Sequence, residues 1–206
     1  MRALLPALAL ALSGCVYQAQ IPHLDATGAA SVGGRQPGSY AALVQTGGWN
    51  IDSTVVGWNC GPHTYKADIN PAWSQGMARA LQASLENVAF PGRILNPADI
   101  SAGGYAAFVS FTQSNATSRV TVVPRMFFGA DSVSETTLEG IMVVQLPDGT
   151  REQQPIVGRG TSTKPLFSCG DAVESVGASA AAALQELLRN AATSTKLILA
   201  QRVKRV

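Results

Sequence analysis

Few polar residues of this chain stand in patterns that support catalysis. The two histidines, His23 and His63, lie far apart and belong to no zinc-binding or Ser-His-Asp motif. No H-E-x-x-H, P-loop or G-x-G-x-x-G pattern occurs, and residues 177–181 resemble a nucleophile elbow only superficially, because their alanines belong mid-helix. The scattered aspartates suit capping better than acid–base chemistry; they include Asp52, Asp68, Asp99, Asp131 and Asp171. No catalytic, cofactor-binding or metal-binding residue is therefore expected.

The N-terminus is typical of an export signal. Arg2 precedes an apolar run that ends at Leu12 and has roughly half the length needed to span a bilayer. The sequence Leu12-Ser13-Gly14-Cys15 then resembles the lipobox of bacterial lipoproteins. This resemblance implies that residues 1–14 are a signal peptide cleaved before Cys15, which is acylated on its sulfur and on its new amino group. The alternative is an ordinary secretory signal followed by a coincidental cysteine.

The residue after the cysteine bears on the destination of the protein. Val16 stands where an aspartate, in the lipoprotein family, usually retains the protein at the inner membrane. The resemblance therefore implies an outer-membrane lipoprotein whose domain faces the periplasm. Two or more acyl chains give stable attachment, whereas one chain holds a protein only marginally. This lipid on Cys15 is the only covalent group that we expect.

The two remaining cysteines form an even pair. With Cys15 assigned to lipid, Cys60 and Cys169 remain in an oxidising compartment. Each lies in a Cys-Gly dipeptide shortly before a predicted helix, so parallel neighbouring helices would bring them to one edge of the layer. A reactive or metal-binding thiol pair is the alternative, but it lacks a C-x-x-C motif or clustered histidines. We therefore predict a structural Cys60–Cys169 disulfide.

Composition and charge indicate one globular domain with attached sequence. The chain has 206 residues, of which 46% are hydrophobic and 14% charged, and its net charge of +2 is too near balance for a nucleic-acid binder. Four basic residues lie in residues 196–206, which we predict to be a basic C-terminal tail. Such a tail could contact anionic head groups, peptidoglycan or an acidic partner; the alternative is a solvated helix end, where cations favour the helix dipole.

The predicted elements define the domain. Residues 15–48 are rich in Gly, Ser and Ala and are predicted to be a lipidated tether, with the folded domain at 49–195 or starting slightly earlier if 40–44 pairs as an edge strand. The predicted strands are 51–58, 105–112, 119–128, 135–146 and 152–163. Asn70 is predicted to cap a helix that ends near Ala89, and a long helix begins at Asp171. This order predicts an α+β two-layer sandwich in which an antiparallel or mixed sheet has both helices on one face.

Three tryptophans could line a ligand groove. They are Trp49, Trp58 and Trp73, of which Trp73 lies on the apolar face of the first predicted helix. An aromatic residue in that position belongs to the core more often than to a binding site.

A family resemblance rests on the lipobox, the order of elements and the two segments 70–73 and 178–188. Over about residues 49–195 the chain resembles small periplasm-facing lipoproteins of the YajG-like and ABC-transport auxiliary type. The resemblance implies a non-catalytic assembly, scaffold or accessory factor of a cell-envelope complex, with an envelope protein as its partner. A lipid- or glycan-binding envelope module is an alternative function, and an envelope hydrolase is a further one.

Overall fold

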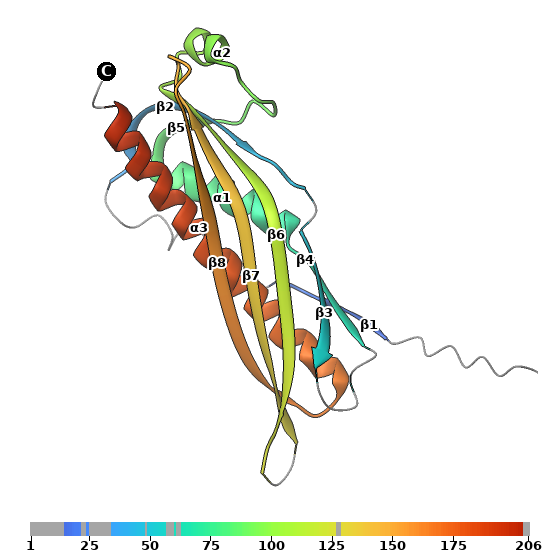
Figure 1. Ribbon diagram of the computed structural model, residues 1–206. Helices are drawn as coiled ribbons and strands as arrows, with labels where there is room; N and C mark the ends of the chain where they lie inside the picture. The colour runs from blue at the N-terminus through green and yellow to red at the C-terminus, as the bar shows by residue number, and fades with distance from the viewer. Residues whose placement is uncertain are drawn as a thin grey trace, which may run out of the picture.

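A long antiparallel meander forms the centre of the fold (Figure 1). Its strands are β6 (Ala107–Pro124), β7 (Ala130–Gln145) and β8 (Arg151–Leu166). The computed structural model describes residues 15–21, 24, 34–47, 49–56, 60, 63–126 and 129–203. The predicted signal peptide and the residues His23, Trp58, Lys204 and Arg205 lie outside this part of the chain.

The other five strands lie on the side of β6 that faces away from β7. Its first half pairs in parallel with β2 (Gln36–Val44), which pairs in parallel with β5 (Leu85–Ala89). Its second half pairs in parallel with β3 (Asn50–Val56), followed by antiparallel β4 (Thr64–Asp68) and parallel β1 (Val16–Ala19). The eight-stranded sheet is therefore mixed. The predicted α+β class is confirmed, and of the two sheet types that the sequence allowed, the mixed one is observed.

Two long helices share one apolar core with the sheet. They are α1 (Asn70–Ser84) and α3 (Ala172–Val203); α3 packs along β7 and β8 and contacts α1. A 3₁₀ turn, η3 (Cys169–Asp171), precedes α3, and the short helix α2 (Pro97–Ala102) lies at the opposite end of the sheet (Figure 1). The apolar faces of both long helices are buried; their fully buried members include Trp73, Met77, Leu81, Val176, Ala180, Leu184 and Leu187.

The first long helix is shorter than predicted. It ends at Ser84, and Leu85–Ala89 form strand β5 on the edge of β2. Local periodicity could not distinguish the two states, because Leu85 and Val88 fit a helical face as well as a strand. Asn70 is also not the cap: Ile69 takes that position without a side-chain hydrogen bond, while Asn70 Oδ1 accepts a hydrogen bond from Gln113 Nε2 at 3.0 Å.

The predictions for the second helix and the strands need two further corrections. The Asp171 carboxylate accepts hydrogen bonds from the backbone N–H groups of Phe167 and Ser168, so Asp171 closes the η3 turn and the long helix begins one residue later, at Ala172. The predicted strands 105–112 and 119–128 are one continuous strand, β6. The polar residues between them favour a loop locally, but their pairing with β7 continues past one register shift.

The predicted tether and tail are both partly structured. Within the described part of 15–48, β1 and β2 are strands of the sheet, and β2 lies between β5 and β6 with Tyr40 and Ala41 fully buried. A tether over these residues is therefore wrong, because burial of this apolar run outweighs the surrounding glycines. Helix α3 continues to Val203, so the described residues of the predicted 196–206 tail are helical, and Arg202 pairs with Glu152 at 3.1 Å. For residues 196–203, the alternative prediction of a helix end is therefore the one that the structure supports.

Helix α3 lies unusually close to β7 and β8. A Cβ atom at Gly158 or Gly160 would overlap the backbone of α3 at Ala183 and Ser179, respectively. Beside these glycines, buried hydroxyls join the helix to β7: Ser179 Oγ is 2.8 Å from the hydroxyl oxygens of both Ser134 and Thr136. Each of these three buried hydroxyls has a hydrogen-bond partner. Their burial therefore avoids the free-energy cost of unsatisfied polar groups.

We expect Gly160→Ala to lower the free energy of unfolding by about 3 kcal/mol, because the added methyl group pushes α3 away from the sheet. Urea denaturation measures this change. Gly34→Ala is the control, since a Cβ at Gly34 meets no atom within 4 Å. Equal midpoints for the two variants would contradict the packing argument.

Candidate functional site

The candidate site is the end of the domain that carries Cys15, which we call the anchor end. Here β6 and β8 end, α3 begins and β1 joins the sheet, opposite α2 and the C-terminus (Figure 1). Segments far apart in the sequence meet at this end because β1 pairs with β4 in register from Val16↔Thr64 to Ala19↔Ala67.

The backbone of Cys15 is held by the residues before β4. Its carbonyl oxygen accepts a hydrogen bond from the Thr64 N–H at 3.1 Å, and its N–H donates to His63 Nδ1 at 3.1 Å. The side chain is an exposed free thiol. Cys15 is therefore fixed to the edge of the folded domain while its sulfur remains accessible.

The predicted Cys60–Cys169 disulfide is present. The bond joins residues 109 positions apart, with Cα atoms separated by 5.5 Å, and connects the segment before β4 with η3. The Tyr65 hydroxyl donates a hydrogen bond to the Cys169 carbonyl oxygen at 2.6 Å. Strand β4 is thus connected to the start of α3 both covalently and by a hydrogen bond.

An aromatic cluster supports this junction. The ring of Tyr17 stacks on Tyr65 with centroids 5.4 Å apart and meets the His63 ring edge-on at 5.5 Å. Burial raises the pKa of Tyr65 to about 12. Sequence reasoning missed the role of these three residues, because no local signal pairs a four-residue strand with β4, nearly fifty positions away.

The two tryptophans that the structure describes belong to the core, as predicted for Trp73, and line no groove. Trp49 and Trp73 are buried, and their ring centroids lie 5.1 Å apart. Trp73 Nε1 donates to the Gln45 carbonyl oxygen at 3.2 Å, so its polar group is satisfied inside the core. Ser179, at the superficial elbow motif, is also buried within α3 and offers no accessible nucleophile.

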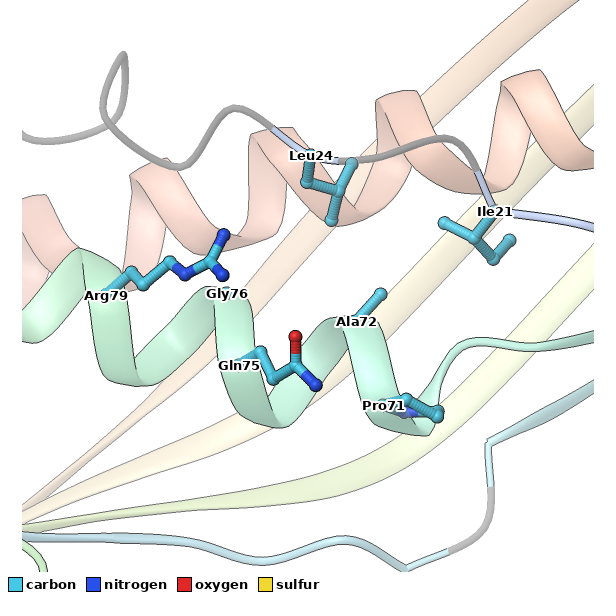
Figure 2. Close-up of a pocket in the computed structure, with 7 residues that line it drawn as sticks. All are labelled: Ile21, Leu24, Pro71, Ala72, Gln75, Gly76 and Arg79. Atoms are coloured by element: carbon cyan, nitrogen blue, oxygen red, sulfur yellow. The ribbon is translucent and has the colours of Figure 1, made fainter.

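A small pocket lies where the segment after β1 crosses α1. Figure 2 shows Ile21 and Leu24 over the helix, opposite Gln75 and Arg79. Its volume of about 160 Å³ is below the range that encloses a drug-sized ligand. The pocket shows instead that Ile21 and Leu24 pack against the surface beside α1.

The described residues contain neither a cluster of metal ligands nor a helix suited to span a membrane. In these ranges, no three His, Cys, Asp or Glu side chains come together as metal ligands would. None of the helices within them is both long enough and apolar enough to cross a bilayer.

Comparisons with known proteins give weak structural likenesses only. No protein-family model matches this chain, and no curated protein matches it significantly. Protein XCC0632 from Xanthomonas campestris is similar with a TM-score of 0.47 at 12% identity, over 94% of this chain and 100% of that one. Protein CT253 from Chlamydia trachomatis gives 0.44 at 7%, over 80% and 99%. Lipoprotein GNA1162 from Neisseria meningitidis gives 0.30 at 14%, over 60% and 84%. At these scores the likenesses carry no argument about function.

We expect loss of the disulfide to lower the free energy of unfolding by about 2 to 4 kcal/mol, because reduction opens a loop that spans 109 positions. Guanidinium denaturation of the double variant Cys60→Ser, Cys169→Ser measures this loss. Cys15→Ser is the matched control, since its thiol is exposed and free. An unchanged midpoint in the double variant would show that the bond contributes nothing to stability.

The raised pKa of Tyr65 predicts a loss of stability in alkali. An unfolded tyrosine ionises near pH 10, whereas folded Tyr65 holds its proton until about 12, so stability is complete below pH 10 and declines as the pH rises from 10 to about 12. Tyr65→Phe should reduce this decline. At pH 7 it should cost about 1 kcal/mol, because the Cys169 carbonyl loses its donor. Urea titrations at several pH values test both effects, and an identical decline in the variant would exclude Tyr65 as its source.

Proposed function

We propose that this chain is an outer-membrane lipoprotein that is anchored through Cys15 and serves as a non-catalytic assembly, scaffold or accessory factor of a cell-envelope complex. The observation that carries the proposal is the division of the three cysteines. Cys60 and Cys169 are bonded to each other, while Cys15, directly after the lipobox residues, is exposed and free. A disulfide suits an oxidising compartment such as the periplasm.

The geometry at Cys15 is compatible with acylation. An acylated amino group keeps one N–H, so the hydrogen bond to His63 Nδ1 can persist in the processed protein. The exposed sulfur leaves room for a diacylglyceryl group. The lipid would then leave the domain at its folded edge, with no tether between them.

The far end of the domain offers a surface for the proposed protein partner. There β5 is the outermost strand beside β2, and the exposed side chains of Phe90 and Ile94 follow it. An unpaired edge and exposed apolar groups are features through which proteins associate.

By comparison, side chains of α3 protect the opposite edge of the sheet, strand β8. On β8, Asn190 Nδ2 of α3 donates to the Val157 carbonyl oxygen at 2.8 Å, and the Arg159 N–H donates to Glu186 of α3 at 2.9 Å. Pro155, in the same alternating set, has no N–H to offer. Strand addition is therefore favoured at β5 over β8.

The resemblance to YajG-like and ABC-transport auxiliary lipoproteins supports this role and remains part of the proposal. The lipid- or glycan-binding alternative loses its main support, because Trp49 and Trp73 belong to the core. No arrangement of described residues favours the envelope hydrolase.

In-cell crosslinking, followed by membrane purification and mass spectrometry, tests the proposal. The wild-type protein should incorporate a palmitate label, fractionate with the outer membrane and crosslink to one stoichiometric envelope protein. Cys15→Ala should lose the label, the membrane fraction and the crosslink, because the anchor is missing. Recovery of the labelled protein alone would contradict the scaffold role.

A matched pair of variants locates the partner surface. Ile94→Asp should reduce the crosslink at least about tenfold, since a charge there opposes burial against an apolar partner. Leu197→Asp is the control, because Leu197 is similarly exposed but lies on α3. Crosslinking by Ile94→Asp at the wild-type level would exclude the β5 edge and the residues that follow it as the binding surface.

A further inference from the structure

Four large apolar side chains are exposed at the anchor end. The exposed fractions are 60% for Val16, 45% for Val123, 95% for Met126 and 83% for Phe167. They are separate from the apolar core, although each lies within a few residues of buried positions. Large apolar groups that cluster beside a functional group mark a contact surface more often than isolated ones do.

Connected contacts bring these four residues to one end of the molecule. Val16 precedes Tyr17, whose ring lies beside Gly170. A Cβ atom added at Gly170 would be 3.2 Å from the Tyr17 ring. Phe167 lies just before this turn and follows β8, whose last residue pairs with Ala130 at the start of β7. Ala130 in turn pairs with the last residue of β6, next to Val123. We call the four side chains the apolar rim.

Charge at the tip of the β6–β7 hairpin is balanced. Arg125, between Val123 and Met126, donates from Nε to Asp131 Oδ2 at 3.0 Å. The pair adds no net charge to the rim, so apolar contact dominates over attraction to anionic groups. The occupant that fits is an apolar medium bordered by polar groups, which is the interface of a lipid leaflet.

The position of Cys15 indicates which lipid leaflet the apolar rim contacts. Val16 is the next residue in the chain, and the Cys15 backbone is hydrogen-bonded to His63 and Thr64. Acyl chains on Cys15 would therefore hold the rim against the leaflet at a high effective concentration, without a spacer that could let it swing away.

We propose that the apolar rim of Val16, Val123, Met126 and Phe167 enters the boundary between the head groups and the acyl chains of the leaflet that holds the acyl chains of Cys15. This inference rests on the proposed acylation of Cys15. The contact orients the domain, so that α3, which is 32 residues and therefore about 50 Å long, carries its C-terminal end and the β5 edge away from the membrane.

Quenching of tryptophan fluorescence by brominated lipids tests the orientation. The lipidated protein is purified from membranes and reconstituted in vesicles of phosphatidylethanolamine and phosphatidylglycerol, with and without bromine on the acyl chains. Phe167→Trp adds a reporter to the rim, and Ile94→Trp adds one at the far end; Ile94 is the matched control because it is also exposed, at 64%. The signal of the native tryptophans is subtracted.

We expect brominated lipids to reduce the added emission of Phe167→Trp by about twofold or more and to leave that of Ile94→Trp unchanged, because bromine quenches only at contact with the acyl region. Both sites are exposed, so thermal midpoints equal to wild type confirm that each variant folds. Met126→Trp provides a second rim reporter with the same expected result.

The mass of the N-terminal peptide separates the two proposals. Acylated Cys15 with quenched rim reporters supports both. If Cys15 is acylated but the emission of Phe167→Trp is no more quenched than that of Ile94→Trp, the rim contact is overturned and the anchor remains supported. A peptide without acyl chains overturns both the anchor and the inference that rests on it.

Discussion

The structure depends on the close contact between α3 and the strands β7 and β8. Gly158 and Gly160 leave room for the helix backbone, and the hydroxyls of Ser134, Thr136 and Ser179 pair within the contact. Helix α1 then packs on α3 through Gly76, where an added Cβ would lie 2.7 Å from Leu188. Strands β1 to β6 are placed on this foundation, because each contributes apolar side chains to the same core. Helix α2 instead packs through Ile100 into a second, smaller cluster.

Elements with local signals could be predicted from the sequence. On β7 the alternation of Leu138, Met142 and Val144 gives the buried face, and the 147–150 turn forms with Gly149 at a positive φ of 88°. Elements that depend on distant partners could not. Strand β5 forms because β2 offers an edge, and β2 is buried because β6 lies beside it. Residues 40–44 could be recognised as a possible edge strand, but the sequence of neither segment indicates its partners, and β2 lies between two strands.

The candidate site shows the same division. The exposed Cys15 and the Cys60–Cys169 bond follow from cysteine number and context, and the structure agrees on the exposure of the one and the pairing of the others. The contacts of Cys15 with His63 required the β1–β4 pairing, which no short-range rule supplies. For Trp73 the helix periodicity was sufficient, because it placed this residue on the apolar face that the structure buries.

The junction between β4 and η3 also determines how the domain carries mechanical load. A force applied at Cys15 enters β1 and passes to β4 through their paired backbones. From there the Cys60–Cys169 bond passes it directly to the start of α3, and the long contact of α3 with β7 and β8 distributes it along the sheet. Such a force would therefore strain the hydrogen-bonded pairing of β1 with β4 first, and only load that passes beyond β4 reaches the covalent bond to the start of α3.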